Sequence, residues 1–373
     1  MRGFGLYVHW PFCQAKCPYC DFNSHVSSDV DHAAWADALC SEIRRCAEEI
    51  PDKMLSSVFF GGGTPSLMQA ETVARVIDTA RAAWPWTNDP EVTLEANPTS
   101  VEAENFAAFH DAGVNRVSIG IQALNDADLR ALGRLHTADE ARQAFEIARS
   151  TFRRVSFDLI YARQNQSLSD WEAELKEALN MAADHLSLYQ LTIEDGTAFG
   201  ARHAQGGLAG LPGEDLSADM FELTQTLTAE AGLPAYEVSN HAVPGGESRH
   251  NLTYWRSEDW VGVGPGAHGR YSKGNLRIAT EALLKPSDWL RAVQLDGTGE
   301  TSRSVIPSDT YNEEVLMMGL RLEEGVPMER LNEYAYGIRE LEKEGLLEVS
   351  DGRVKTSAKG KPLLNAILRA LII

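Results

Sequence analysis

The stretch LYVHWPFCQAKCPYCDFNSH, residues 6–25, places three of the chain's five cysteines within eight residues. An apolar strand-like run is followed by Cys13, Cys17 and Cys20 in a C-x3-C-x2-C spacing. A structural zinc site normally takes four ligands in paired spacings, and no second pair follows. Three thiolates on one short loop can instead hold three irons of a cubane cluster and leave the fourth iron open for an outside ligand. This spacing predicts an iron–sulfur centre just after the first strand.

Bulk properties exclude some functions and compartments. The chain has 373 residues and a formal net charge of −20, with a pI near 4.9. Nucleic-acid binding needs a Lys and Arg footprint for the phosphates, so this charge argues against it. No apolar run approaches the roughly 18–20 residues of a membrane span, and no signal segment precedes the first strand-like run. We therefore expect a cytoplasmic protein, in which clustered cysteines stay reduced and indicate metal binding.

The other two cysteines look different from the cluster. Cys40 and Cys46 fall six residues apart on a predicted helix. This separation puts them on different faces of the helix, so they cannot both face one metal site. We expect ordinary buried thiols at these two positions.

Six short apolar runs alternate with amphipathic stretches in the first half of the chain. The runs are GLYVHW, SVFFGGGTP, VTLEANP, RVSIGIQ, VSFDLIY and HLSLYQLTI, and helical stretches such as 31–50, 70–84 and 137–150 separate them. Six β/α units in series imply a parallel sheet. We predict an α/β fold with a partial (β/α)6 TIM-like barrel, and a doubly wound open sheet is the alternative. In both folds the ligand site lies at the carboxyl ends of the strands.

We predict three regions along the chain. They are the barrel over residues 1–240, a glycine-rich connecting region over 241–299 that carries the run HNLTYW, and a small C-terminal domain over 300–373. The last region is helical sequence followed by two alternating runs around Asp351-Gly352, which is a strong hairpin signal. Helices followed by a hairpin outline a winged-helix-like α+β domain. DNA binding and a packing or lid role are both open for this domain, and the acidic chain favours the second.

The cysteine spacing resembles the signature of the radical S-adenosylmethionine (SAM) enzymes, and further motifs agree. They are FFGGGTPSL, LEANP, AGVNRVSIGIQ, LGRLH, HNLTYW and GVGPGAHG, together with Tyr19 just before the last cysteine of the loop. From about residue 4 to its end, the chain is similar to the family that contains oxygen-independent coproporphyrinogen III dehydrogenases and the HemW haem chaperones. The resemblance implies a radical SAM barrel whose three cysteines ligate a 4Fe–4S cluster, with SAM on the open iron.

The resemblance also implies which residues form the SAM pocket. They are Tyr7, Gly62, Gly63, Thr64, Glu95, Gln122, Arg134 and Asp158. Glycine suits the turn because a Cβ would block close approach of the backbone to a ligand. Glu95 and Asp158 can accept hydrogen bonds from the ammonium or the ribose hydroxyls of SAM, and Arg134 can pair with its carboxylate.

One turn departs from the family pattern. After FDLIY the family usually continues with a Gly-Leu-Pro-type turn, whereas this chain has Ala162-Arg163-Gln164-Asn165. The placement of Asp158 at that rim therefore stays open at this point.

Two functions from different classes compete within the family. One is radical oxidative decarboxylation of coproporphyrinogen III, and the other is binding of haem for delivery to a client protein. The dehydrogenases carry a fourth cysteine two residues after the third, where this chain has Phe22. Only residues 1–12 precede Cys13, which leaves little chain for the extended arm associated with the dehydrogenases. Both features favour the haem chaperone, with SAM cleavage left open. A scaffold or sensor with a cluster and no SAM chemistry is a third class.

The run HNLTYW, residues 250–255, matches a pattern that is typical of HemW-type proteins and linked with haem. The resemblance therefore implies haem binding by His250, Asn251, Tyr254 and Trp255. A neutral imidazole can ligate iron, Asn251 can orient that imidazole, and the two aromatic rings offer flat surface to a porphyrin. The alternative is a core histidine with packed aromatic neighbours. Expected partners are haem-requiring clients, membrane-associated respiratory enzymes among them, and a second copy in a homodimer.

Overall fold

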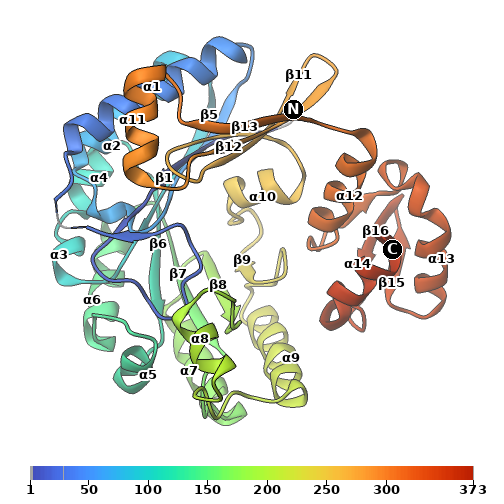
Figure 1. Cartoon of the computed structure of the whole chain (residues 1–373). Helices are drawn as coiled ribbons and strands as arrows, with labels where there is room; N and C mark the ends of the chain where they lie inside the picture. The colour runs from blue at the N-terminus through green and yellow to red at the C-terminus, as the bar shows by residue number, and fades with distance from the viewer. Residues whose placement is uncertain (1–2, 28, 373) are drawn as a thin grey trace.

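A curved eleven-stranded sheet forms the body of the protein (Figure 1). The computed structural model describes residues 3–27 and 29–372. The six predicted runs are neighbouring parallel strands in chain order, which confirms the partial barrel. These strands are β1 (Phe4–Trp10), β4 (Leu55–Gly62), β5 (Trp86–Ala96), β6 (Arg116–Gln122), β7 (Arg154–Tyr161) and β8 (His185–Gln190).

Five further strands extend the sheet at both edges, so the barrel stays open. Beside β8 lies the antiparallel β9, and beside β1 lies β10, which is parallel to it. Antiparallel strands then follow β10 to the other edge. The bounds of these strands are β9 (Asn240–Ala242), β10 (Asp259–Val263), β11 (His268–Lys273), β12 (Leu276–Ala282) and β13 (Glu300–Ile306).

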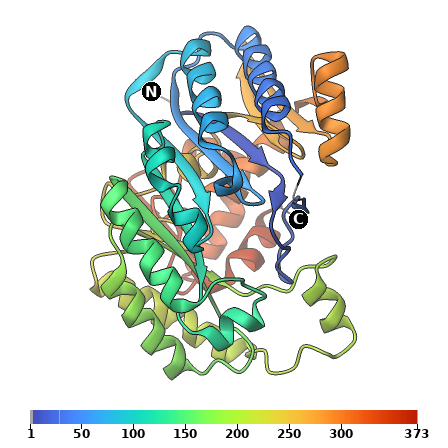
Figure 2. The same ribbon diagram turned by 90° about the vertical axis from the view of Figure 1, so that its left-hand side faces the viewer.

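Helices cover the convex face of the sheet (Figure 2). Several begin at side-chain caps that satisfy their first amides, with Asp31 capping α1 and capping boxes at Thr137 and Ser167. The helices of the body are α1 (His32–Glu49), α2 (Ala70–Ala83), α3 (Ser100–Ala103), α4 (Phe106–Asp111), α5 (Asp126–Ala131), α6 (Ala138–Thr151), α7 (Leu168–Met181), α8 (Ala198–Ala204), α9 (Glu214–Glu230), α10 (Arg249–Trp255) and α11 (Pro286–Asp296).

Alternation along the strands separates the core from the site. On β6, the fully buried Val117, Ile119 and Ile121 belong to the apolar core shared with the outer helices. Their neighbours on the other face, which include Ser118 and Gln122, line a cavity inside the barrel. Successive side chains of a strand point to opposite faces, so one strand supplies both packing and polar groups.

The segment 241–299 differs from the expected connecting region. It supplies β10, β11 and β12 to the large sheet, and α11 packs on α1. The difference arises because these strands are short and the turns between them are glycine-rich. Gly264 and Gly266 have φ of 107° and 75°, a backbone conformation that glycine adopts without steric cost. The sheet therefore continues to Ile306.

The C-terminal domain starts after β13 and has a core of its own. It contains α12 (Ser308–Gly319), β14 (Val326–Pro327), α13 (Ala335–Lys343), β15 (Leu347–Ser350), β16 (Arg353–Thr356) and α14 (Leu364–Ile372). The predicted hairpin is β15–β16, and its turn residues Asp351 and Gly352 have φ of 51° and 72°. Positive φ at both positions is the requirement of a type I′ turn, so helices followed by a hairpin are confirmed.

The length and polarity of the helices also bear on membrane insertion. Among the residues described, no helix is long and apolar enough to span a bilayer.

The packing of α11 generates a stability prediction. The indole of Trp289 is fully buried and stacks on that of Trp35, with ring centroids 5.4 Å apart. Trp289→Ala should lower the free energy of unfolding by about 3–5 kcal/mol because it opens a large cavity. Urea unfolding followed by circular dichroism measures the change. Leu295→Ala on the same helix, where the side chain is 70% exposed, is the control and should change little. Equal effects of the two variants would contradict the integration of α11 into the core.

Candidate metal centre and cofactor pocket

One pocket at the carboxyl ends of the strands brings most of the predicted site residues together. The cysteine loop covers it on one side, and the ends of β4, β5, β6 and β7 form its floor. Ten predicted residues line it: Cys13, Cys17, Cys20, Gly62, Gly63, Thr64, Glu95, Gln122, Arg134 and Asp158. Tyr19 and Phe22 line the same pocket.

The three cysteine sulfurs are free thiols, each with its own polar neighbour. Cys13 accepts from the Thr64 hydroxyl at 3.4 Å, and Cys17 accepts from Arg134 Nη1 at 3.3 Å. In the part of the chain that the structure describes, no group of three or more His, Cys, Asp and Glu side chains converges on a single metal ion. A cubane cluster does not need such convergence, because each thiolate binds a different iron. The donor set, three free thiols that line one pocket, fits a cluster with three protein ligands.

The glycine turn after β4 lies directly against the first strand. Gly62 has φ of 113°, and a Cβ there would lie 2.6 Å from the His9 ring. A Cβ on Gly63 would lie 2.7 Å from the Phe12 carbonyl oxygen. Both distances are too short for a side chain, so glycine is required at both positions. The backbone of this turn consequently faces the pocket at close range.

Two partly buried carboxylates, Glu95 and Asp158, line the pocket without a basic side chain in contact. Burial, together with the nearby Asp158, raises the pKa of Glu95 to about 8. Burial raises the pKa of Asp158 to about 6, although hydrogen bonds from Ser187 and Ser118 oppose the shift. The Ser118 hydroxyl lies 3.3 Å from Asp158 Oδ1, and the Gly62 amide lies 3.3 Å from Glu95 Oε2. Such a pair favours a ligand that carries a positive charge.

Arg134 lies between the cysteine loop and the strand ends. Besides Cys17, its guanidinium donates to Asn97 Oδ1 at 2.6 Å and to the Gly120 carbonyl at 2.9 Å. Asn97 was not among the predicted residues, although it lines the pocket. Its signal was its position in LEANP, directly after β5, where the carboxyl end of a parallel strand is expected to face the ligand site. Gln122 has φ of 73°, and its buried side-chain oxygen has no partner among the described residues.

Tyr7 does not line the pocket. It lies one step deeper in the barrel, where its hydroxyl contacts His9 Nδ1 at 3.0 Å. His9 Nε2 contacts the Asn23 carbonyl at 2.9 Å. A carbonyl only accepts, so Nε2 carries the proton and the Tyr7 hydroxyl donates to Nδ1. Burial lowers the pKa of His9, which keeps this ring neutral. Tyr7 thus supports the cysteine loop through His9 and Asn23.

The predicted haem residues lie elsewhere, on α10 at the amino-terminal ends of the strands. The His250 ring is 1% exposed, and its nitrogens contact Ser57 Oγ at 2.9 Å and the Tyr254 hydroxyl at 2.6 Å. The described contacts of this ring do not include Asn251, which was expected to orient it. Burial lowers the pKa of His250 to about 3, so the imidazole is neutral. The structure separates HNLTYW from the cysteine pocket.

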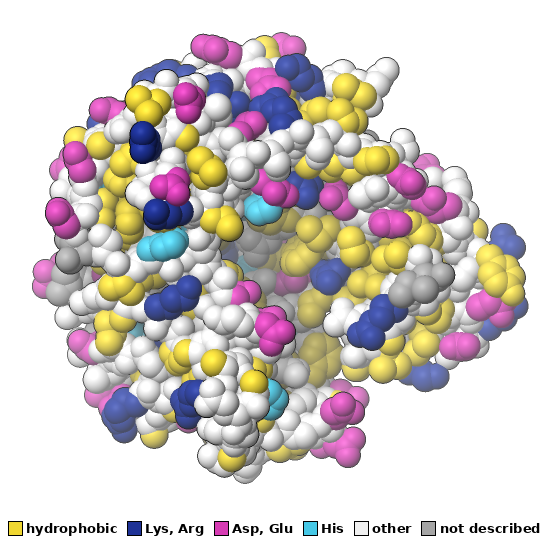
Figure 3. All heavy atoms as spheres, viewed as in Figure 1, with side chains coloured by type: hydrophobic (Ala, Val, Ile, Leu, Met, Phe, Trp, Pro, Cys, Tyr) yellow, Lys and Arg dark blue, Asp and Glu magenta, His cyan; other side chains and the backbone are white. Residues whose placement is uncertain are grey.

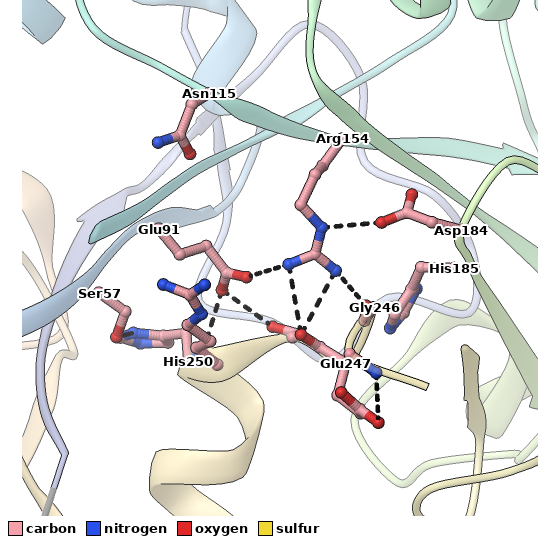
Figure 4. A network of polar contacts seen from close by, with 12 residues as sticks. Ser57, Glu91, Asn115, Arg154, Asp184, His185, Gly246, Glu247 and His250 are labelled. Carbon is pink, nitrogen blue, oxygen red and sulfur yellow. Dashed lines mark hydrogen bonds and ion pairs between the residues drawn. The ribbon is translucent and has the colours of Figure 1, made fainter. Parts of the chain in front are cut away.

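A buried ionic network holds the amino-terminal end of α10 (Figure 4). Glu91 accepts from the His250 amide at 3.2 Å and pairs with Arg154 at 2.9 Å. Arg154 also pairs with Asp184 at 2.7 Å and donates to the carbonyls of residues 246 and 247 just before the helix. These contacts tie α10 to β5 and β7, so its position relative to the barrel is tightly constrained.

The unusual turn after β7 does not displace Asp158 from the pocket. Ala162 and Asn165 have φ of 57° and 59°, a left-handed conformation that glycine adopts without steric cost. The side chain of Arg163 is buried and pairs with Asp128 and Glu174 at 2.6 Å each. These ion pairs and the bond from the Asn165 amide to the Gly210 carbonyl at 2.6 Å hold the turn.

Comparisons with known proteins agree with this geometry. The model of the radical SAM superfamily matches residues 7–178, and that of the HemN C-terminal domain matches residues 306–363. One relative is radical S-adenosyl methionine domain-containing protein 1, mitochondrial, of Bos taurus. The two proteins are 39% identical, and their alignment covers 98% of this chain and 87% of that protein. The chain is 37% identical to the heme chaperone HemW of Escherichia coli over 86% of this chain and 83% of that protein, and 34% identical to HemW of Mycobacterium tuberculosis over 99% and 95%.

A solved structure shares the whole fold. It is coproporphyrinogen III oxidase (HemN) from Escherichia coli, a radical SAM enzyme, with a TM-score of 0.81 and 21% identity over 99% of this chain and 90% of that chain. An open barrel with three cysteines above its strand ends, followed by this C-terminal domain, is therefore the arrangement of a radical SAM protein. With 34–37% identity to its members over most of the length, the chain belongs to the family of the HemW haem chaperones. Membership of the superfamily implies a 4Fe–4S cluster and SAM.

The cluster assignment predicts a selective effect of cysteine removal. Anaerobically reconstituted protein should hold about four irons per chain, and Cys17→Ala should lose the cluster because one of three thiolate ligands is gone. Cys40→Ala is the matched control, since its sulfur is buried in α1 and contacts the Arg75 carbonyl. Iron analysis and visible absorption measure the outcome. A complete cubane in Cys17→Ala would overturn the ligand assignment.

The raised carboxylate pKa values predict pH-dependent SAM binding. Near neutral pH, Glu95 and Asp158 are partly protonated, with pKa values of about 8 and about 6. A cationic ligand interacts with their ionised forms, so SAM binding should release protons and tighten as the pH rises from about 6 to 8, by up to about tenfold per unit. Calorimetry of the reconstituted protein in two buffers of different ionisation enthalpy measures the release.

Glu95→Gln should remove most of this proton release, whereas Glu172→Gln on the exposed face of α7 should leave it unchanged. A SAM affinity that is independent of pH over this range would contradict the role of the carboxylates.

Proposed function

We propose that this protein binds haem and delivers it to client haem proteins, while it carries a 4Fe–4S cluster with SAM on the open iron. The observation that carries the proposal is the similarity along almost the whole chain to proteins named heme chaperone HemW. Phe22 supports it, because an apolar ring lines the cofactor pocket where the dehydrogenases place a fourth sulfur.

In this proposal the cysteine pocket is a cofactor site. Cys13, Cys17 and Cys20 hold three irons of the cluster. The SAM ammonium lies near Glu95 and Asp158, whose raised pKa values reflect buried carboxylates without a contacting cation. The Gly62–Thr64 turn presents its backbone to the methionyl end of SAM. Haem delivery needs no substrate radical, so SAM acts here as a ligand that completes the coordination of the cluster.

In this proposal haem binds beside α10, at the amino-terminal ends of the barrel strands. A hollow separates the barrel from the C-terminal domain, and hydrophobic side chains face it from that domain (Figure 3). Helix α10 lies beside this hollow and contacts α12 (Figure 1). Tyr254 and Trp255 offer aromatic surface there, since both side chains are only partly buried. Both ring nitrogens of His250 are engaged in hydrogen bonds, one with Ser57 and one with Tyr254. One of these bonds must break before the ring can ligate haem iron.

Haem titration tests the proposal. The wild-type protein should develop a saturable Soret band, and His250→Ala should weaken haem binding by about tenfold or more if the ring ligates iron. His203→Ala, an exposed histidine on α8, is the control and should bind as the wild type does. Absence of a Soret band in the wild type would overturn haem binding, and an unchanged titration of His250→Ala would remove only the role of that ring.

An activity assay separates the carrier from the dehydrogenase. Reconstituted protein with SAM, a reductant and coproporphyrinogen III should form no protoporphyrinogen IX. Efficient formation of this product would contradict the carrier function.

A further inference from the structure

A second cavity, of about 190 Å³, lies between the end of α10 and the C-terminal domain. We refer to it as the inter-domain cavity. Its walls come from the loop after α10, from α12, and from the segment around β14 and β16. It is lined by Trp255, Arg256, Ser257, Glu258, Val315, Gly319, Leu322, Glu324, Gly325, Val326, Pro327, Arg330 and Arg353. It is separate from the cysteine pocket, which shares none of these residues.

Of the three arginines that line the inter-domain cavity, one has no acidic partner among the described residues. Glu324 pairs with Arg256 at 2.8 Å and with Arg353 at 3.4 Å. Arg330 bonds only to neutral oxygens among the described residues, the Tyr311 hydroxyl at 2.9 Å and the Arg256 carbonyl at 3.5 Å. Three arginines and two glutamates line the cavity, for a formal charge of 3 − 2 = +1 in a chain of net charge −20.

The barrel side of the cavity has unpaired polar groups next to an aromatic surface. The indole Nε1 of Trp255 and the hydroxyl of Ser257 have no hydrogen-bond partner among the described residues. Ser257 has φ of 51°, a conformation that costs a serine free energy and is concentrated at functional sites. The guanidinium of Arg321 lies 5.8 Å from the Trp255 ring centroid, so one side of the ring is already covered.

A carboxylate attached to a flat apolar body fits this combination. Guanidinium groups bind carboxylates through two parallel hydrogen bonds, and an indole packs against a planar ring system. The cavity is large enough for a propionate-sized side chain. It is too small for a porphyrin macrocycle, because sites for ligands of that size have volumes of several hundred Å³. Figure 3 shows a hollow between the barrel and the C-terminal domain, with hydrophobic side chains on the side of that domain.

We propose that the inter-domain cavity binds one propionate carboxylate of the haem, with Arg330 as the carboxylate-binding group. The inference rests on the proposed haem-carrier function and places the macrocycle edge beside Trp255, between the barrel and the C-terminal domain. It also gives the C-terminal domain a binding role, since Arg330 belongs to that domain and Trp255 to the barrel. A shift of this domain would then release the propionate.

Soret titrations of the full-length chain with haem b and with its dimethyl ester, in which both propionates are blocked, test the proposal. Arg330→Gln should weaken haem binding by about tenfold or more, the usual loss for a charge-assisted hydrogen bond. Arg339→Gln is the matched control, because Arg339 is exposed on α13 and does not line the cavity. Wild type and Arg330→Gln should bind the ester equally, about as weakly as Arg330→Gln binds haem.

Each outcome has a separate meaning. If the wild type binds haem and its ester equally, or if Arg330→Gln binds haem as the wild type does, the propionate site is wrong and the carrier function stands. If Arg330→Gln weakens binding of the ester as well, Arg330 acts through the fold, which also overturns the proposal. If the wild type binds no haem, the proposed function itself fails.

Thermal melts show whether Arg330→Gln folds. Where it does not, Arg330→Lys, which keeps the charge and loses the two-pronged donor, should bind haem between the two extremes. The comparison of haem with its ester on the wild type needs no variant at all, so the proposal stays testable in either case.

Discussion

The contact between the glycine turn and the first strand holds the cofactor site together. The Gly63 amide donates to the Trp10 carbonyl at 2.7 Å, and the Thr64 amide donates to the Phe12 carbonyl at 2.9 Å. These bonds join the end of β4 to the residues that lead into Cys13. Only glycine permits this approach, because the His9 ring and the Phe12 carbonyl occupy the space of any Cβ. The position of the three cysteines above the strand ends follows from this contact.

The interior of the barrel contains polar groups instead of the branched aliphatic layers of a closed TIM barrel. Glu95 and Asp158 lie near the carboxyl end, and Glu91, Arg154 and His250 lie near the amino end. Buried charges are costly unless they are paired or bind a ligand. The charged groups near the amino end are paired with one another and anchor α10. The two carboxylates near the carboxyl end have no contacting cation, so they suit a positively charged cofactor.

Two separate sites therefore share one scaffold. Tyr7 lies between them: its hydroxyl donates to His9 above, and its ring stacks on His250 below with centroids 6.3 Å apart. The cysteine loop, which His9 supports through Asn23, and the helix that carries HNLTYW are thus linked through the contacts of one tyrosine.

Much of the body could be predicted from the sequence. Local patterns determined the six parallel strands, the cysteine loop and the hairpin at Asp351-Gly352, because each depends on neighbouring residues and on short-range sterics. The alternating pattern also placed the ligand site at the carboxyl ends of the strands, and the family resemblance named most of its residues.

Only the tertiary structure decided the rest. Within 241–299, β10 pairs with β1, which is far away in the sequence, and β11 and β12 extend the sheet from β10. The patterns of these strands are too short to reveal the pairing. The burial of His250, the displacement of Tyr7 from the pocket and the inclusion of Asn97 all depend on how separate elements pack. Arg330 and Trp255 line one cavity only because α12 lies against α10, and no local pattern encodes the contact between two domains.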